Sequence, residues 1–314
     1  MASLARLREI KGFRGTIYRI EQLEARVGFA AKGLLNFVRC ELNGVDSRPS
    51  VAAVMVGRND DYMSDFIHRL RATIAWNAKY LVDEVVFVEW NPPANRELLS
   101  LTLTKQFDFL RAYVVPPAVH SMICENLNIA LLEYHAKNVG IRRAQAPWIV
   151  ATNADAAFSL DSVQTILRSN LAANVVWNTQ RVDIPWREGR QSGITLPASL
   201  RYRRFSPYNQ YGTGEFCFAS RELWHQVRGF DETMVRHRIG CDMRGTAQMM
   251  AHGAEVRKAG VVLHLSHPSS CSEGVQPHHG EFAPLDNLPY QNDANWGLGD
   301  RREVEIAERV WRIE

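Results

Sequence analysis

The chain has 314 residues, of which 46% are hydrophobic and 23% charged, as in an ordinary globular protein. Its formal net charge of +3 is too small to indicate binding to nucleic acid. This length corresponds to one large domain or two ordinary ones, and it allows enough burial to fold without disulfide staples.

The five cysteines are odd in number and far apart, so we expect neither a disulfide framework nor a cysteine-only zinc site. This cysteine usage favours a reducing compartment. The first residues do not resemble a cleavable signal peptide, and no run of about 18 apolar residues predicts a membrane span. We therefore expect a cytoplasmic protein.

Residues 1–48 are predicted to form an N-terminal helical extension, because apolar residues recur near one helix face with basic residues among them. The favoured interpretation is a helix that packs on the main domain or on a partner subunit of a homo-oligomer. The alternative is a basic amphipathic surface within residues 1–40 that rests on the anionic inner face of a membrane.

After this extension, strand-like and helix-like patterns alternate along the chain. Alternation of this kind predicts an α/β domain with a mostly parallel sheet, helices on its faces and ligands at the carboxyl ends of the strands. The predicted strands are residues 50–57, 82–90, 107–117 and 148–152, and the predicted helices are residues 63–74 and 126–145.

The second half of the chain is less regular. We assign residues 49–290 to the main domain and residues 291–314 to a C-terminal tail helix, in which Asp300 and Glu303 form a capping box. The elements expected before this tail are a strand at 175–185, a loop at 194–210, a strand and short helix within 212–232, a helix at 242–252 and strands within 255–268.

Carboxylates follow several of the predicted strands at their carboxyl ends. Glu89 ends the second strand, Asp155 follows the fourth, and Asp60 follows the first. Neighbouring carboxylates suit Mg²⁺ or Mn²⁺, which prefer hard oxygen ligands and leave positions open for phosphates. His264 and His267 end a later strand, and manganese accepts imidazole beside carboxylate, so at least one of them is expected to be a ligand.

Several short motifs follow one another along the chain. They are VMVGRND at 54–60, Asn-Val-Gly at 138–140 followed by Arg142, Asn-Ala-Asp at 153–155, GEFCFASRELWHQVRGFDE at 214–232, and Asp242. Their order resembles that of the nucleotide-sugar-dependent glycosyltransferases of the A-type (GT-A) fold. The resemblance covers about residues 50–270, and the order is more specific than any single motif. Asn153 stands where the Asp-x-Asp metal motif of that family has its first acid.

The resemblance implies a Rossmann-like sheet and a divalent-metal-assisted transfer of a sugar from a nucleoside diphosphate, with UDP as the first expectation. The acceptor is expected to be a hydroxyl of a saccharide or glycolipid, and Asp242 the base of an inverting reaction, with Glu215 in reserve. The metal would be held by Asp155 with His264 or His267. The expected donor contacts are Val56, Gly57, Arg58, Asn59, Asp60, Glu89, Asn138, Arg142, Asn153 and Ala154, and the expected acceptor-side residues are Trp186, Tyr211 and Trp224.

Most of these residues also have a purely structural interpretation. Asp155 and Asp242 are placed to cap or complement helix termini, and Glu89 to end a strand. Arg142 is equally consistent with a solvated helix charge, and tryptophans lie more often in a core than on a sugar-binding surface. For Asp155 we favour the metal; for Asp242 the two interpretations stand level.

Three other functions remain open from the sequence. A retaining glycosyltransferase has the same fold, and a non-catalytic sugar-nucleotide-binding protein would account for Asn153. A nucleotidyltransferase is disfavoured, because the VGRNDD loop has one glycine and two acids where a glycine-rich phosphate loop is needed.

Overall fold

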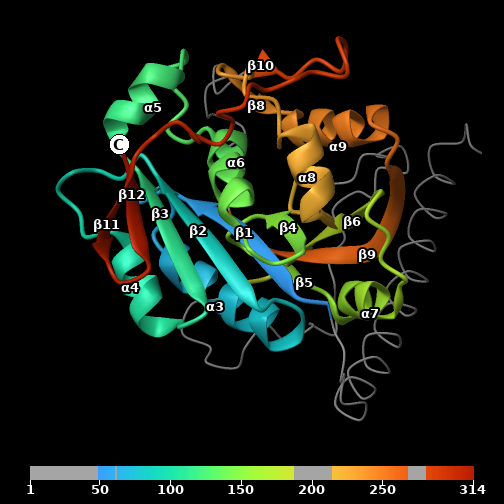
Figure 1. The fold of residues 1–314 in the computed structure, drawn as a ribbon. Helices are drawn as coiled ribbons and strands as arrows, with labels where there is room; N and C mark the ends of the chain where they lie inside the picture. Colours follow the sequence, from blue (N-terminus) through green and yellow to red (C-terminus); the bar gives the residue numbers. More distant parts are fainter. Residues whose placement is uncertain (1–48, 61, 187–213, 268–280) are drawn as a thin grey trace, which may run out of the picture.

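The computed structural model describes residues 49–60, 62–186, 214–267 and 281–314 (Figure 1). The predicted N-terminal extension and the loop predicted at 194–210 lie outside these residues. Among the described residues, no helix is both long and apolar enough to cross a membrane.

Strands and helices alternate through the first half of the described chain, as predicted. The helix predicted at 126–145 is shorter, and it begins only at Glu133. The elements are β1 (Val51–Gly57), α3 (Phe66–Tyr80), β2 (Glu84–Trp90), α4 (Leu99–Gln106), β3 (Leu110–Val115), α5 (Pro117–Ile123), α6 (Glu133–Arg143), β4 (Trp148–Thr152), β5 (Ala156–Phe158) and α7 (Leu160–Arg168).

The second half adds strands of both directions and two more helices. Its elements are β6 (Val175–Ile184), β7 (Phe216–Ser220), α8 (Arg221–Val227), β8 (His237–Ile239), α9 (Cys241–Ala251), β9 (Glu255–Leu265), β10 (Glu281–Phe282), β11 (Glu303–Ala307) and β12 (Val310–Ile313).

Within the described residues, one large sheet has the order β11-β12-β3-β2-β1-β4-β7-β6-β9-β5, and β8 pairs with β10 in a second, small sheet. The strands from β12 to β4 are mutually parallel, and β6 is parallel to β9. β7 runs antiparallel to both β4 and β6, and β5 runs antiparallel to β9. The predicted α/β class with a central sheet flanked by helices is confirmed, and the sheet has antiparallel pairs both on its β7 side and at its β11 edge.

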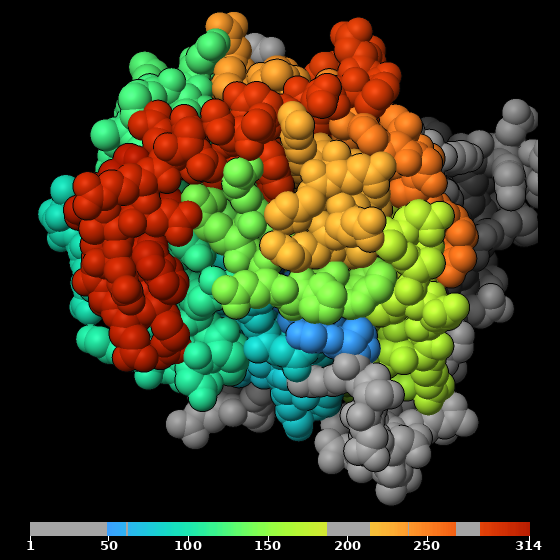
Figure 2. All heavy atoms as spheres, viewed as in Figure 1, coloured from blue at the N-terminus to red at the C-terminus, as the bar shows by residue number. Residues whose placement is uncertain are grey.

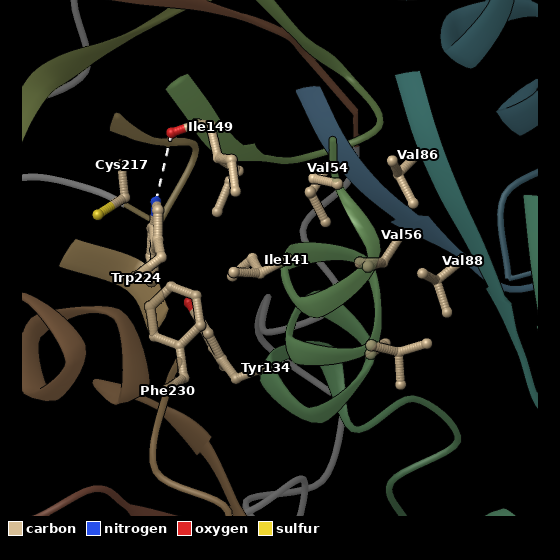
Figure 3. Close-up of a cluster of buried hydrophobic side chains, with 14 of the residues drawn as sticks. Val54, Val56, Val86, Val88, Tyr134, Ile141, Ile149, Cys217, Trp224 and Phe230 are labelled. Carbon is tan, nitrogen blue, oxygen red and sulfur yellow. Dashed lines mark hydrogen bonds between the residues drawn. The ribbon is translucent and has the colours of Figure 1, made fainter. Parts of the chain in front are cut away.

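The two faces of the sheet are covered by different helices (Figure 1). Alternate residues of β1 point to opposite faces, so Val54 packs in the cluster with α6 while Met55 packs in the cluster with α3. Helices α6, α8 and α9 cover the first face, and α3, α4 and α7 cover the second. Figure 3 shows valines of β1 and β2 facing α6 in the first cluster. At Gly140 the helix approaches β1 so closely that a Cβ would lie 2.5 Å from a methyl of Val54.

The predicted C-terminal tail helix is wrong, because this segment forms the β11–β12 hairpin. The apolar positions from Val304 to Trp311 fit a helical stripe in the sequence, but the free edge of β3 decides the outcome. β12 pairs in parallel with β3, and its Val310 and Ile313 are fully buried there. The turn is made by Arg309, which has a positive φ of 60°. Figure 2 shows the C-terminal segment, in red, covering this edge of the molecule.

Candidate active site

Three predicted metal ligands meet at one edge of the sheet. Ala156 pairs with His264 between β5 and β9, and the N–H of Leu265 donates to the carbonyl of Asp155 at 2.9 Å. This pairing brings the carboxylate of Asp155 to the two histidines. Its Oδ2 lies 2.9 Å from Nε2 of His267 and 3.3 Å from Nε2 of His264. The sequence predicted at least one of the two imidazoles here, and the structure contains both.

This cluster fits a divalent metal ion. One carboxylate oxygen and two imidazole nitrogens lie within 4.8 Å of one another, and this mixed donor set is accepted by Mn²⁺. Burial alone would raise the pKa of Asp155, but the hydrogen bonds and charges of His264 and His267 lower it well below its usual value. Asp155 is therefore an ionised carboxylate, and it is only 7% exposed.

The structure also decides against Asp155 as the cap of the helix that follows it. The N-cap of α7 is Ser159, whose hydroxyl accepts a hydrogen bond from the N–H of Ser162 at 3.1 Å. The carboxylate of Asp155 faces the imidazoles instead.

A second layer of charged residues, which the sequence analysis missed, lies behind His264. The β6–β9 register pairs Asp183 with His264, and Asp183 Oδ1 lies 2.8 Å from His264 Nδ1. Because an ionised carboxylate only accepts, His264 donates from Nδ1–H to Asp183 and from Nε2–H to Asp155. A metal bound at Nε2 would take the place of that second proton. Burial would raise the pKa of Asp183, but hydrogen bonds from His264 and Arg181 lower it to about 2. In the sequence, the signal was the alternation of Arg181 and Asp183 on either side of the apolar Val182 in this strand.

Arg181 links this layer to Glu215. Its guanidinium donates to Asp183 Oδ1 from Nη2 at 2.8 Å and to Glu215 Oε1 from Nη1 at 2.8 Å. Glu215 precedes β7, and its carbonyl accepts from the hydroxyl of Thr152 at 2.6 Å, which places it beside the end of β4. The guanidinium of Arg181 thus connects the cluster of candidate metal ligands to Glu215, the predicted reserve base.

Asp242 lies in the first turn of α9, whose N-cap position is Gly240. It is next to Gly214, where an added Cβ would lie 3.2 Å from the Cβ of Asp242 and 2.6 Å from the hydroxyl of Tyr134. Burial and the negative charge of Glu215 raise the pKa of Asp242 to about 6. A carboxyl with this pKa can accept a proton near neutral pH.

Lys137 of α6 is a further charged residue that the sequence analysis missed. Its ammonium is fully buried and donates to Glu133 at 2.7 Å, to Asn153 Oδ1 at 2.8 Å and to the carbonyl of Gly214 at 2.9 Å. The amide oxygen of Asn153 is thus bound by Lys137. The same ammonium connects the end of β4 to the glycine beside Asp242.

The loop after β1 is held in place by its own contacts. Arg58 forms an ion pair with Asp60 at 2.9 Å, and Asn59 donates to the carbonyl of Glu97 at 2.8 Å. Val56 and Gly57 end β1, next to β4, whose carboxyl end carries Asn153 and Ala154. The donor contacts that the sequence analysis expected here remain predictions; they concern Val56, Gly57, Arg58, Asn59, Asp60, Asn153 and Ala154.

Three predicted donor-binding residues are engaged elsewhere. Glu89 is fully buried and accepts from the N–H groups of Leu99 and Ser100 at the start of α4, at 3.0 and 2.8 Å. Asn138 is fully buried and binds the backbone of Phe230 with both ends of its amide.

Arg142 donates to the carbonyls of Ala294 and Trp296, so it anchors the C-terminal segment to α6. These contacts support the structural interpretation for Glu89, Asn138 and Arg142, and their predicted contact with a donor stays a prediction.

The predicted acceptor-side aromatic residues have different outcomes. Trp224 is fully buried in the core and its indole N–H donates to the carbonyl of Ile149 at 3.3 Å (Figure 3), so its prediction as a sugar-stacking surface is wrong. Trp186 lies just after β6, with the guanidinium of Arg69 5.7 Å from its ring centre, and its predicted role stays a prediction. Tyr211 lies outside the described residues.

No protein-family model and no curated protein matches this sequence. Among solved structures, GalNAc-T7 with UDP, GalNAc and Mn²⁺ aligns with 74% of the chain at 11% identity and a TM-score of 0.49. The chain spans about half, 47%, of that protein. The mannosyltransferase PcManGT from Pyrobaculum calidifontis, in complex with GDP-Man and Mn²⁺, aligns with 78% of the chain and 67% of its own length, at 15% identity and a TM-score of 0.46. At such identities, no residue's role is transferred from either structure.

Proposed function

We propose that this protein is a divalent-metal-dependent glycosyltransferase that uses a nucleoside-diphosphate sugar. The observation that carries the proposal is the meeting of Asp155, His264 and His267 at the sheet edge. Asp183 and Arg181 link this cluster to Glu215, whose negative charge helps to raise the pKa of the half-buried Asp242. The ordered sequence motifs that resemble GT-A enzymes support the same function. UDP is the first donor to test, and the acceptor is a saccharide or glycolipid hydroxyl.

Asp155, His264 and His267 would hold the metal, Mn²⁺ or Mg²⁺. When bound, such an ion neutralises the negative charge that develops on a diphosphate leaving group. Asp183 keeps His264 in the tautomer whose Nε2 lone pair is available to a metal. The side chain of Arg181 is 36% exposed, so it offers a positive charge that a substrate anion can reach beside this cluster.

Asp242 is the proposed catalytic base. In the transfer, the acceptor oxygen forms a bond to the anomeric carbon while the bond from that carbon to the diphosphate oxygen breaks. The diphosphate leaves with the electron pair, and the acceptor's proton passes to the carboxylate of Asp242. Attack from the face opposite the diphosphate inverts the anomeric centre. Glu215 contributes by raising the pKa of Asp242.

The test is release of nucleoside diphosphate from a panel of UDP-, GDP- and dTDP-sugars, with Mn²⁺, with Mg²⁺ and with EDTA. Slow hydrolysis of one donor that EDTA and Asp155→Ala both abolish would support the proposal and identify the donor. NMR of the product's anomeric configuration then separates inversion from retention.

Nucleotide binding without turnover, once candidate acceptors are supplied, would favour the non-catalytic alternative. Lack of binding to every donor would overturn the proposal.

A further inference from the structure

Helix α3 carries a buried row of polar side chains. Arg69, Thr73 and Asn77 are spaced by four residues, which aligns them on one face of the helix. They are 5%, 0% and 1% exposed. Polar groups buried to this extent are costly unless each one has hydrogen-bond partners.

The partners of this row are backbone atoms of the two segments that carry the proposed metal ligands. Thr73 donates its hydroxyl to the carbonyl of Ala154 at 2.6 Å, in the peptide bonded to Asp155. Asn77 donates to the carbonyl of Ala156 at 3.0 Å and accepts from the N–H of Phe158 at 2.9 Å. The segment that carries Asp155 is thus held by α3 on both sides of the carboxylate.

Arg69 holds the other segment. Its Nη1 donates to the carbonyls of Leu265 and Ser266, at 2.7 and 3.1 Å, and these are the two residues between the histidines when the chain leaves β9. His267 lies beyond Leu265, the last residue of β9, so its position depends on how this turn is held. Nε of Arg69 donates to Asp65 at 2.7 Å, which fixes the guanidinium itself.

We infer that the row Arg69, Thr73 and Asn77 positions the metal site by fixing the backbone on which its three ligands stand. This inference rests on the proposed function, since it requires Asp155, His264 and His267 to bind a metal. None of the three row residues reaches the ligand atoms, so each is a positioning residue. Sites of this kind lose affinity when the groups that orient the ligands are removed, commonly by about 10- to 100-fold.

The molecule contains a matched control in Arg244 of α9. Arg244 is also buried, forms one ion pair from Nε to Asp231 at 2.7 Å, and donates from Nη1 to two carbonyls, those of Pro284 and Asp286. Arg69 and Arg244 thus make the same set of bonds, but only those of Arg69 lead to the metal ligands. Their substitutions should be similarly harmful to folding.

The experiment is calorimetric titration of the full chain with Mn²⁺ alone, together with the unfolding temperature of the metal-free protein. The variants are Arg69→Met, Arg69→Lys, Thr73→Val and the control Arg244→Met. We expect Arg69→Met and Arg244→Met both to lower the unfolding temperature. Only Arg69→Met should weaken Mn²⁺ binding, by about 10-fold or more.

Arg69→Lys, which keeps a charge and one donor group, should recover part of the affinity. Thr73→Val is the variant to use if Arg69→Met does not fold, because it removes one hydroxyl at nearly constant volume, and it should also weaken binding. Equal Mn²⁺ affinity in the wild type, Arg69→Lys and Thr73→Val would overturn the inference, as would equal losses in Arg69→Met and Arg244→Met.

Asp155→Ala separates this failure from failure of the metal site. If wild-type protein binds no Mn²⁺, or if Asp155→Ala binds it as tightly as wild type, the metal site itself is wrong and the inference falls with it. If Asp155→Ala loses binding while the row variants keep it, the metal site stands and only the positioning role is overturned.

Discussion

Two strand ends of the sheet carry a buried acid, and they use it in opposite ways. At the end of β2, Glu89 accepts two backbone N–H groups and the hydroxyl of Ser100 from the first turn of α4. Beyond β4, Asp155 faces two imidazoles. Burial raises the pKa of Glu89, whereas the imidazoles overcome burial and lower that of Asp155.

The difference lies in which partners the fold brings to each carboxylate. Backbone N–H groups at a helix terminus have no other partner, so an acid among them completes the helix. Imidazole nitrogens can bind either the acid or a metal, so an acid among them can exchange hydrogen bonds for a metal ion. An acid near a strand end therefore completes a helix in one case and lies in a candidate metal cluster in the other.

A third acid, the half-buried Asp242, gives the largest predicted effect. Asp242→Asn should lower the rate of sugar transfer by about 10²- to 10⁴-fold, because it removes the proposed base. Mn²⁺ affinity should stay close to that of wild type, since Asp242 is not among the clustered ligands. Rate measurements at saturating donor, with a parallel Mn²⁺ titration, check both. A transfer rate within about twofold of wild type would remove Asp242 from the mechanism.

The comparison of the two strand ends is tested most directly by removing each acid in turn. Asp155→Asn should weaken Mn²⁺ binding by about 100-fold or more, since it replaces a ligand itself rather than an outer partner. Glu89→Gln should leave Mn²⁺ affinity unchanged. A titration of both variants decides the matter, and equal losses would show that the contrast drawn between the two acids is mistaken.

Glu89→Gln should instead lower the free energy of unfolding by about 1–3 kcal/mol, because the amide leaves a buried N–H at the start of α4 without its acceptor. Denaturant unfolding of the metal-free protein measures this change. Gln at position 89 without any loss of stability would contradict the role of Glu89 as the acceptor for α4.

The smallest predicted effect is a pH dependence of the transfer rate that is caused by the titration of Asp242. A base acts only when deprotonated, so a pKa raised to about 6 means that activity is present above pH 6 and falls below it. Below pH 6, the rate of sugar transfer should fall about tenfold for each pH unit. The residual activity of Asp242→Asn should lack this step. A wild-type rate that stays flat down to pH 5 would argue against Asp242.

Local patterns were sufficient to predict much of the fold. Continuous apolar runs predicted β1, β2, β3 and β4. These strands lie in the parallel part of the sheet, where helices cover both faces and side chains on both sides of each strand are buried. The same reasoning failed for the C-terminal tail, where the apolar spacing fits a helix and a hairpin equally. The exposed edge of β3 selected the hairpin, and that edge is not visible in the sequence of the tail.

The candidate site was only partly predictable. Asp155, His264 and His267 were found because each lies near the end of a strand, and strand ends are recognisable from the local sequence. Asp155 and His267 are 112 residues apart, and the β5–β9 register that joins them is a property of the folded sheet. Arg181, Asp183 and Lys137 were missed because a charged residue inside a strand or helix becomes meaningful only once its partner in the folded chain is known.

By itself, the sequence determined the parallel strands β1 to β4 and which polar residues stand near their ends, because both follow from local apolar runs and turn chemistry. The tertiary structure decided what each of those polar residues does. A buried carboxylate must find hydrogen-bond donors. Strand register and helix packing determine whether those donors are the backbone of α4, as for Glu89, or the two histidines at the end of β9, as for Asp155.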